Sequence, residues 1–357
     1  MRAKLREWGP VIVLALIPAL PLLAGSGLVN TRAGGDSPFL LVRVHQLVLN
    51  LRGGIFPARW MPHAAYGLGY PFFNFYASLP YYLAAALKLT GVGYIWSIKC
   101  TQALGFVLAA MSIYGFSREL HHKRSTSLLV ALVYSCAPFH MVNVYVRGDS
   151  LSEFYAFVFF PLILWSLLRL HRQGSIRNAV WVALSYAGLL LTHNISAMLF
   201  SPFVLLHVLS FVVRTQVRQR PHACRFSGLR SAIDSFLALG MGALMSAWFW
   251  LPALAERGNV YLRDMTTGYF NYALHFRSLD LVQHSLVFDY AITADKEPFR
   301  MGMVQAILAL AGLTAVVVWW IQQRRVESHS AFLVLLLAAS TFMITPFSRI
   351  LWDHIPL

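Results

Sequence analysis

Long apolar stretches separated by short polar segments are the main pattern of this chain. Val11–Leu23, Ser127–Val142 and Ala331–Ile344 contain no charged residue. A helix of roughly 20 apolar residues crosses a bilayer. The pattern predicts an all-α fold, a polytopic transmembrane helical bundle of about nine spans. These are expected at residues 10–29, 94–117, 126–144, 152–169, 178–193, 195–213, 232–254, 301–321 and 331–346.

The segment Pro71–Leu89 is apolar enough to be a tenth span, but two features favour a helix at the membrane surface. The region around it is rich in proline, which breaks helices, and in tyrosine and tryptophan, which prefer the headgroup level. Treating it as interfacial also leaves most basic residues of the short loops on the side of the N-terminus. The positive-inside rule then predicts a cytoplasmic N-terminus.

This topology places two long loops outside the cytoplasm, at about residues 30–92 and about 255–300. The first is expected to contain interfacial helices. We expect residues 1–357 to form a single transmembrane domain. Because the chain stops soon after the last predicted span, at Trp352–Leu357, we also expect it to be the N-terminal portion of a longer protein.

Composition agrees with a membrane protein and narrows its partners. Hydrophobic residues make up 58% of the chain and charged residues 12%. The net charge of +15 does not indicate nucleic acid, because basic residues at span ends act first as orientation signals. Cys100 and Cys136 lie in predicted spans and Cys224 in a basic loop, so no disulfide framework is expected.

Three polar junctions flank predicted spans on the outer side. The first contains Asp36, in the turn Gly34–Pro38 after the first span. A partly desolvated carboxylate has a raised pKa and could take a proton from an acceptor hydroxyl. Alternatively, Asp36 caps a helix that begins near Pro38 by accepting from its free N–H groups.

The second junction, Arg147–Glu153, separates the third and fourth spans. Asp149 and Glu153 are four residues apart and would share one face of a helix that begins there. They could hold a divalent cation, orient a hydroxyl or pair with Arg147. Asp149 or Ser150 as N-cap, with Glu153 in the first turn, is an ordinary helix start. The candidate catalytic residues, and the metal ligands if there is a metal, are Asp36, Asp149 and Glu153.

The third junction, Thr192-His193-Asn194, joins the fifth and sixth spans. His193 could donate to a phosphate or relay a proton, whereas Asn194 also suits a plain turn. The external arginines present a planar fork that matches phosphate oxygens, and general attraction to anionic lipid is the alternative. The candidate substrate-binding residues are Arg43, Arg52, Arg59, Arg147, His193, Asn194, Tyr70 and Tyr76.

The order of these motifs resembles a family of bacterial membrane proteins. After the first span come an Asp, the run Phe56-Pro57-Ala58-Arg59-Trp60, the run Gly67-Leu68-Gly69-Tyr70-Pro71-Phe72-Phe73-Asn74-Phe75-Tyr76, then Tyr145-Val146-Arg147-Gly148 and Leu191-Thr192-His193-Asn194-Ile195-Ser196. These runs resemble the 6-pyruvoyl-tetrahydropterin-synthase-related membrane proteins. That family looks similar to the GT-C superfamily of polyprenyl-phosphate-sugar glycosyltransferases. The resemblance covers residues 1 to about 200 and continues thinly to the end.

The resemblance implies a GT-C-like bundle in the bacterial cytoplasmic (inner) membrane, with its active face extracytoplasmic. Asp36 would match the acid that acts as base or positions the acceptor, and Asp149 or Glu153 would match the second external acid. Pro71–Leu89 would match the interfacial helix. The implied partners are a polyprenyl-phosphate-linked sugar and membrane lipid.

Three features depart from the family pattern. Leu40 stands where the family carries a His, the first acid is single where many GT-C enzymes have a pair, and relatives continue beyond the C-terminal run. The first two weaken a metal-dependent mechanism. A divalent cation at the three acids is the one cofactor that the sequence leaves open.

We therefore expect a membrane glycosyltransferase that moves a sugar from a polyprenyl-phosphate donor to an acceptor hydroxyl. A transporter or lipid flippase for envelope precursors would carry ionisable residues near the bilayer midplane and often an inverted repeat. The acids lie at one interface, no repeat is evident, and only Lys99 and Asp234 are placed to lie deeper. A non-catalytic membrane scaffold is the third alternative.

Overall fold

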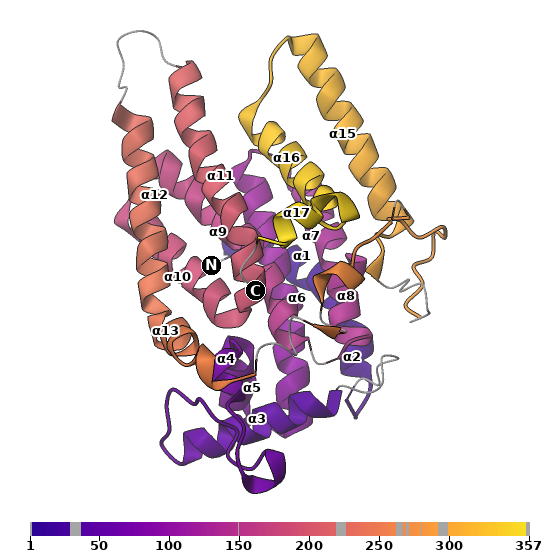
Figure 1. The fold of residues 1–357 in the computed structure, drawn as a ribbon. Coiled ribbons are helices and arrows are strands. Elements are labelled where there is room, and N and C mark those ends of the chain that lie inside the picture. The colour runs from indigo at the N-terminus through magenta and orange to yellow at the C-terminus, as the bar shows by residue number, and fades with distance from the viewer. Residues whose placement is uncertain are drawn as a thin grey trace. The chain divides into compact units, whose positions relative to one another are not determined.

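A computed structural model describes residues 2–28, 37–148, 150–218, 226–261, 267–268, 271–278, 280–291 and 299–354. Within these ranges the regular structure is helical, and the only strand-like pairings are two isolated bridges. The all-α class predicted from the sequence is confirmed. The chain divides into two compact units, Met1–Pro252 and Ala253–Leu357. Figure 1 labels the helices named below.

The first unit contains long helices joined by short turns, with a group of shorter helices inserted after the first long one. Its helices are α1 (Arg2–Leu16), η1 (Ile17–Ala19), α2 (Leu20–Ala24), α3 (Ser37–Arg52), η2 (Ala65–Gly67), α4 (Phe72–Phe75), α5 (Leu79–Leu89), α6 (Tyr94–Glu119), α7 (Arg124–Ser135), α8 (Pro138–Tyr145), α9 (Leu151–Gln173), α10 (Ile176–Thr192), α11 (Asn194–Arg218), α12 (Phe226–Met245) and α13 (Ala247–Ala255).

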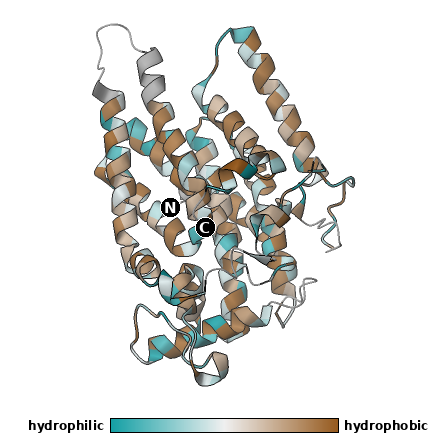
Figure 2. Cartoon of the chain, in the orientation of Figure 1, coloured by the Kyte–Doolittle hydropathy of each residue, from teal (hydrophilic) through white to brown (hydrophobic). Residues whose placement is uncertain are grey.

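Several of these helices can cross a membrane, and apolar residues cover them along their length (Figure 2). Within the described ranges, 5 helices are long and apolar enough by themselves, and the number rises to 8 if each bent helix pair is one span. One such pair is α7 with α8, bent by 41°. The 17-residue α10 is apolar but shorter. The chain is thus a multi-pass helical protein, and the count of nine spans remains a prediction.

Contacts between helix ends give the direction of α1 and α6. Glu7 Oε1 lies 3.2 Å from Arg118 Nε, and Lys99 Nζ donates to the Gly25 carbonyl, so the two helices run antiparallel. The segment between them therefore leaves and re-enters at the same end of the unit. Its helices α3, α4 and α5 have 16, 4 and 11 residues, too short for a hydrocarbon core of ~30 Å. As predicted, Pro71–Leu89 forms no continuous span.

Helix α9 runs parallel to α6, so both begin at that end. The Tyr155 hydroxyl of α9 donates to the Thr101 carbonyl near the start of α6, and Trp165 Nε1 donates to Glu119 Oε2 at its last residue. Helix α10 returns antiparallel, because Ser185 Oγ lies 3.2 Å from Ser166 Oγ and Asn178 Nδ2 donates to the Arg169 carbonyl. The starts of α6, α9 and α11 therefore share one end.

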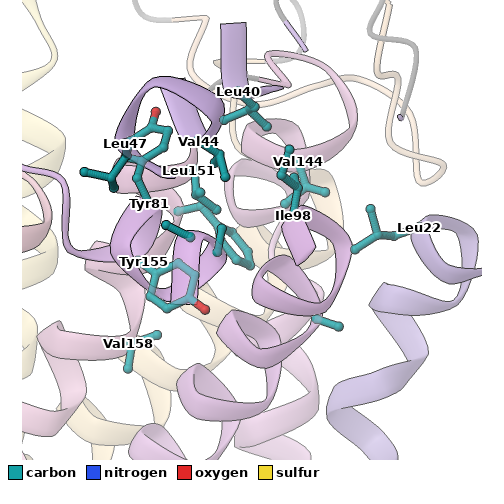
Figure 3. Packing of buried hydrophobic residues seen from close by; sticks show 14 of the residues in the cluster. Leu22, Leu40, Val44, Leu47, Tyr81, Ile98, Val144, Leu151, Tyr155 and Val158 are labelled. Carbon is teal, nitrogen blue, oxygen red and sulfur yellow. The ribbon is translucent and has the colours of Figure 1, made fainter. Parts of the chain in front are cut away.

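The largest apolar cluster lies where α3 and α5 pack on the starts of α6 and α9 (Figure 3). Leu47 of α3, Tyr81 of α5, Ile98 of α6 and Leu151 of α9 are each at most 1% exposed. Side chains packed at crystal-like density resist displacement, since any shift opens a void or a clash. This cluster holds the short helices firmly against the ends of the long ones.

The opposite end of the unit is held by ion pairs. Glu119 is the last residue of α6. Its Oε1 lies 3.2 Å from Arg172 Nη1 of α9, and its Oε2 lies 3.7 Å from Arg169 Nε of the same helix. These side chains lie between a fifth and a third exposed, so water screens the pairs only in part. This is the end that the positive-inside rule predicts to be cytoplasmic.

The Tyr134 hydroxyl replaces a backbone hydrogen bond that Pro161 cannot make inside α9. Pro161 has no N–H to bond the carbonyl four residues earlier, that of Phe157. The Tyr134 hydroxyl of α7 donates to this carbonyl at 2.7 Å. The bond ties the bent pair α7–α8 to α9.

The second unit is described by itself. Its helices are η3 (Arg257–Asn259), η5 (Tyr272–Leu274), α15 (Met303–Gln323), α16 (Ser328–Met343), η7 (Pro346–Ser348) and α17 (Arg349–Trp352). None of the residues of α15 is buried although the helix is strongly apolar, as expected of a helix that faces lipid. Arg300 Nη2 pairs with Asp280 at 2.8 Å, and the Tyr272 ring stacks on Trp352.

Candidate functional site

The second polar junction forms an ion pair at the start of α9. Arg147 Nη1 contacts Glu153 Oε2 and donates to Asn143 Oδ1 at 3.2 Å. The Arg147 and Glu153 side chains are 36% and 21% exposed, so solutes can reach both. Ser150 makes no side-chain capping bond. Of the arrangements open from the sequence, the structure therefore shows Glu153 paired with Arg147.

The third junction is a tight turn between α10 and α11 that contacts the first loop. His193 is 9% exposed, and its ring meets that of Tyr76 edge to face with centroids 6.1 Å apart. Asn194 Nδ2 donates to the Phe75 carbonyl at 3.5 Å. The segment after α4 and the α10–α11 turn are therefore neighbours, although about 120 residues separate them in the chain.

His193 also lies within electrostatic range of the ion pair. Burial lowers the pKa of His193 below its ordinary value; the Glu153 carboxylate raises that pKa and the Arg147 guanidinium lowers it further. Since burial is the largest effect, the imidazole is neutral near pH 7. The second and third junctions thus form one cluster.

Arg43 of α3 is held in an aromatic cage beside this cluster. Its guanidinium carbon lies 4.5 Å from the Phe72 ring centroid and 5.9 Å from that of Tyr76. Nη1 donates to the Tyr81 hydroxyl at 3.1 Å. Cation–π contacts fix the plane of the guanidinium and leave its charge in place. Tyr76 therefore contacts both Arg43 and His193 and links the first loop to the third junction.

The structure brings together some predicted site residues and not others. Arg43, Tyr76, Arg147, Glu153, His193 and Asn194 gather at one end of the first unit, and we call them the junction cluster. Arg52, Arg59 and Tyr70 are exposed. Asp36 and Asp149 lie outside the described residues. Their roles remain predictions.

A metal site cannot be built from the described residues alone. Among them, no three His, Cys, Asp or Glu side chains lie close enough together to hold a metal ion. Glu153 is the one described member of the three acids considered as metal ligands, so the divalent cation stays an open prediction.

Three polar or aromatic groups at this end were absent from the predicted site. Ser196 hydrogen-bonds His193, and Tyr81 bonds Arg43. Asn143 accepts from Arg147. Two of these contacts are local: the His-x-x-Ser spacing suits a helix start, and Asn143 and Arg147 are four residues apart. The Arg43–Tyr81 contact depends on packing between α3 and α5.

Lys99 is buried, as its sequence position suggested, but it lies near a helix start. It is 1% exposed and is the sixth residue of α6. Its ammonium donates to the Gly25 carbonyl and lies 5.2 Å from the Trp96 ring centroid. Lys99, the most buried of the described cations in this region, therefore lies at the same end of the first unit as the junction cluster.

Comparison with known proteins agrees with this architecture. Residues 73–355 match the family model of the 6-pyruvoyl-tetrahydropterin synthase related domain, described as a membrane protein. The chain is also 25% identical over 248 residues to an uncharacterised protein of Lactococcus lactis subsp. cremoris. That match covers 68% of this chain and 38% of the relative, so the chain spans well under half of the relative's length. The chain belongs to the 6-pyruvoyl-tetrahydropterin synthase related family of membrane proteins.

Proposed function

We propose that this protein is an integral membrane glycosyltransferase of the GT-C type that uses a polyprenyl-phosphate-linked sugar. The observation that carries the proposal is the junction cluster. It combines two arginines, a neutral imidazole and a carboxylate at one end of a bundle of apolar helices. A lipid-linked sugar phosphate needs such a polar site next to hydrocarbon.

Each group of the junction cluster has a role in the proposed reaction. The acceptor hydroxyl oxygen attacks the anomeric carbon, and the bond from that carbon to the phosphate oxygen breaks. Arg43, held flat by aromatic rings, stabilises the negative charge that develops on the departing phosphate. His193, which packs against the same Tyr76 ring as Arg43, shares this task.

The proton of the acceptor hydroxyl passes to a carboxylate. Asp36 is the predicted base, and it lies outside the described residues. Glu153 is oriented by Arg147 and positions the acceptor hydroxyl. Phosphate leaves readily as an anion, so orientation and charge stabilisation supply most of the rate enhancement.

The proposed topology has nine spans and a cytoplasmic N-terminus, in a bacterial inner membrane. The junction cluster then faces the extracytoplasmic side, and the polyprenyl chain lies among the apolar helices. A transporter or flippase for envelope precursors and a non-catalytic scaffold are the alternatives. A transport path would be expected to have a charged residue near the middle of the membrane. Lys99 lies near the start of α6, not halfway along it.

The test is donor consumption by the purified full chain in lipid. A panel of polyprenyl-phosphate-linked hexoses is incubated with envelope extract as acceptor source, and released polyprenyl phosphate is quantified by mass spectrometry. Wild-type protein should consume at least one donor. Glu153→Gln should lower the rate by about two orders of magnitude, the usual worth of a well-placed catalytic group.

Asp234→Asn is the matched control, since it neutralises a carboxylate on α12, distant in sequence from the junctions. It should retain the wild-type rate. Size-exclusion profiles identify any variant that has lost its fold. If folded wild-type protein consumes no donor of the panel, or if Glu153→Gln is as fast as wild type, the proposed function is wrong.

A further inference from the structure

His193 ends one helix and begins the next. Its backbone N–H donates to the Leu189 carbonyl at 3.0 Å as the last bond of α10. Its carbonyl accepts from the Ala197 N–H at 2.9 Å as the first bond of α11. The backbone of His193 is therefore fixed on both sides, and the residue is the N-cap of α11.

The side chain of His193 completes this cap. Nδ1 accepts from the Ser196 backbone N–H at 3.3 Å, the bond that an N-cap side chain makes to the third helical residue. An accepting Nδ1 carries a lone pair and no proton. The Ser196 hydroxyl, 2.7 Å from the same nitrogen, must therefore be the donor of that second bond.

Two bonds to Nδ1 decide where the proton of the neutral ring sits. With Nδ1 occupied as an acceptor, the proton is on Nε2. Protonating Nδ1 of this tautomer would remove the lone pair that accepts the Ser196 backbone N–H and would place a positive charge in a buried position. The imidazole is thus a neutral N–H donor whose direction is set by α11.

The charged and titratable groups around this ring come from three segments. Glu153 of α9 and Arg147 before it act on His193 electrostatically, and Tyr76 packs against the ring. The Arg43 guanidinium carbon lies 5.9 Å from the centroid of the same Tyr76 ring. The fixed N–H donor therefore belongs to a site that already contains two guanidinium groups.

We infer that Ser196 is a positioning residue that holds His193 as the neutral Nε2–H tautomer, so that this N–H donates to an oxygen of a lipid phosphate. The inference rests on the proposed function for the nature of the ligand. A neutral donor suits a phosphate that must be released again, because it binds an anion less tightly than a third cation.

Two variants separate the capping role of His193 from its role as a hydrogen-bond donor. His193→Asn keeps an N-cap acceptor, since asparagine is among the best capping residues, but removes the Nε2–H group. Ser196→Ala keeps the imidazole and the backbone bond but removes the hydroxyl that blocks Nδ1. Ser201→Ala is the matched control, because Ser201 lies farther along α11, where its hydroxyl bonds the Ala197 carbonyl and the Tyr186 hydroxyl of α10.

The first measurement is nitrogen NMR of the full chain labelled at histidine, with His193 identified by its absence from His193→Asn. Wild type should show a neutral ring with the proton on Nε2. In Ser196→Ala the pKa of His193 should rise toward its ordinary value, because the neutral form has lost a donor at Nδ1. Ser201→Ala should match wild type.

The second measurement is the binding of a polyprenyl phosphate that carries no sugar, monitored by native mass spectrometry. His193→Asn should weaken binding at least tenfold while thermal unfolding stays unchanged, and Ser201→Ala should bind as wild type. A proton on Nδ1 in wild type, an unchanged pKa in Ser196→Ala or full binding by His193→Asn would overturn the inference. These readouts involve no sugar transfer, so an inactive but binding protein refutes only the proposed function.

Discussion

At the scale of single residues, Tyr145 shows how one hydroxyl replaces a helical hydrogen bond. The first span is interrupted between η1 and α2, where the Leu22 N–H would ordinarily donate to the Pro18 carbonyl four residues earlier. The Tyr145 hydroxyl accepts from the Leu22 N–H at 3.3 Å and donates to the Pro18 carbonyl. Both backbone groups are thereby satisfied inside the protein.

Tyr145→Phe should destabilise the protein because it leaves these two buried backbone groups without their partner. Leaving a buried donor or acceptor unpaired costs about 1–3 kcal/mol. Thermal unfolding in detergent measures the change. Tyr66→Phe is the control and should lie within about 0.5 kcal/mol of wild type, because Tyr66 is fully exposed. Equal unfolding temperatures for the two variants would contradict this account of the helix break.

Residue types predicted part of the candidate site. Glu153, His193 and Arg43 stood out because charge or imidazole beside apolar spans is costly and calls for a reason. The same reasoning selected Arg52, which the structure leaves exposed nine positions after Arg43. Which arginine meets the polar junctions depends on how α3 packs against α5 and α6, and no local pattern encodes that.

At the scale of elements, α10 and α12 cross closely at a glycine. A Cβ on Gly242 of α12 would lie 2.6 Å from the Ala183 carbonyl oxygen of α10. A backbone oxygen cannot rotate away as a flexible side chain can. Small residues let transmembrane helices approach this closely. The resulting van der Waals contact stabilises helix association in the bilayer, where no hydrophobic effect drives it.

Gly242→Ala should therefore push the two helices apart and cost about 1–3 kcal/mol, as overpacking does. Gly240→Ala is the matched control in the same helix, since a Cβ there meets nothing within 4 Å. It should be neutral or slightly stabilising, because alanine is the better helix former by up to about 1 kcal/mol. Thermal unfolding of both variants measures the difference in stability. If Gly242→Ala is as stable as Gly240→Ala, α10 and α12 do not cross as closely as described.

Apolar length predicted most long helices of the first unit, but not their bends. The expected span at 126–144 is two helices, α7 and α8, joined at Cys136–Ala137 with a bend of 41°. Pro138 allows the bend because it cannot continue the bonding of α7. Hydropathy averages over a window and does not register a break in hydrogen bonding.

At the scale of the whole molecule, the sequence predicted that distant polar junctions meet at one end. The structure shows this for the second and third junctions and for Arg43 of the first loop. The prediction was possible because consecutive spans cross the membrane in opposite directions. The basic residues of the short loops then assign each junction to one side. This alternation of direction does not determine which residues of each junction touch, because those contacts depend on side-chain packing between helices.

Cysteine labelling tests the predicted membrane orientation of α6, a helix of 26 residues and thus about 39 Å long. In a chain whose three cysteines are replaced by alanine, Thr90→Cys marks the end with the junction cluster and Lys123→Cys marks the opposite end; both native residues are exposed. A membrane-impermeant maleimide should label Thr90→Cys in intact cells and Lys123→Cys only after disruption, since basic loops stay cytoplasmic. The reverse pattern would place the cluster in the cytoplasm, where an extracytoplasmic lipid-linked donor could not reach it.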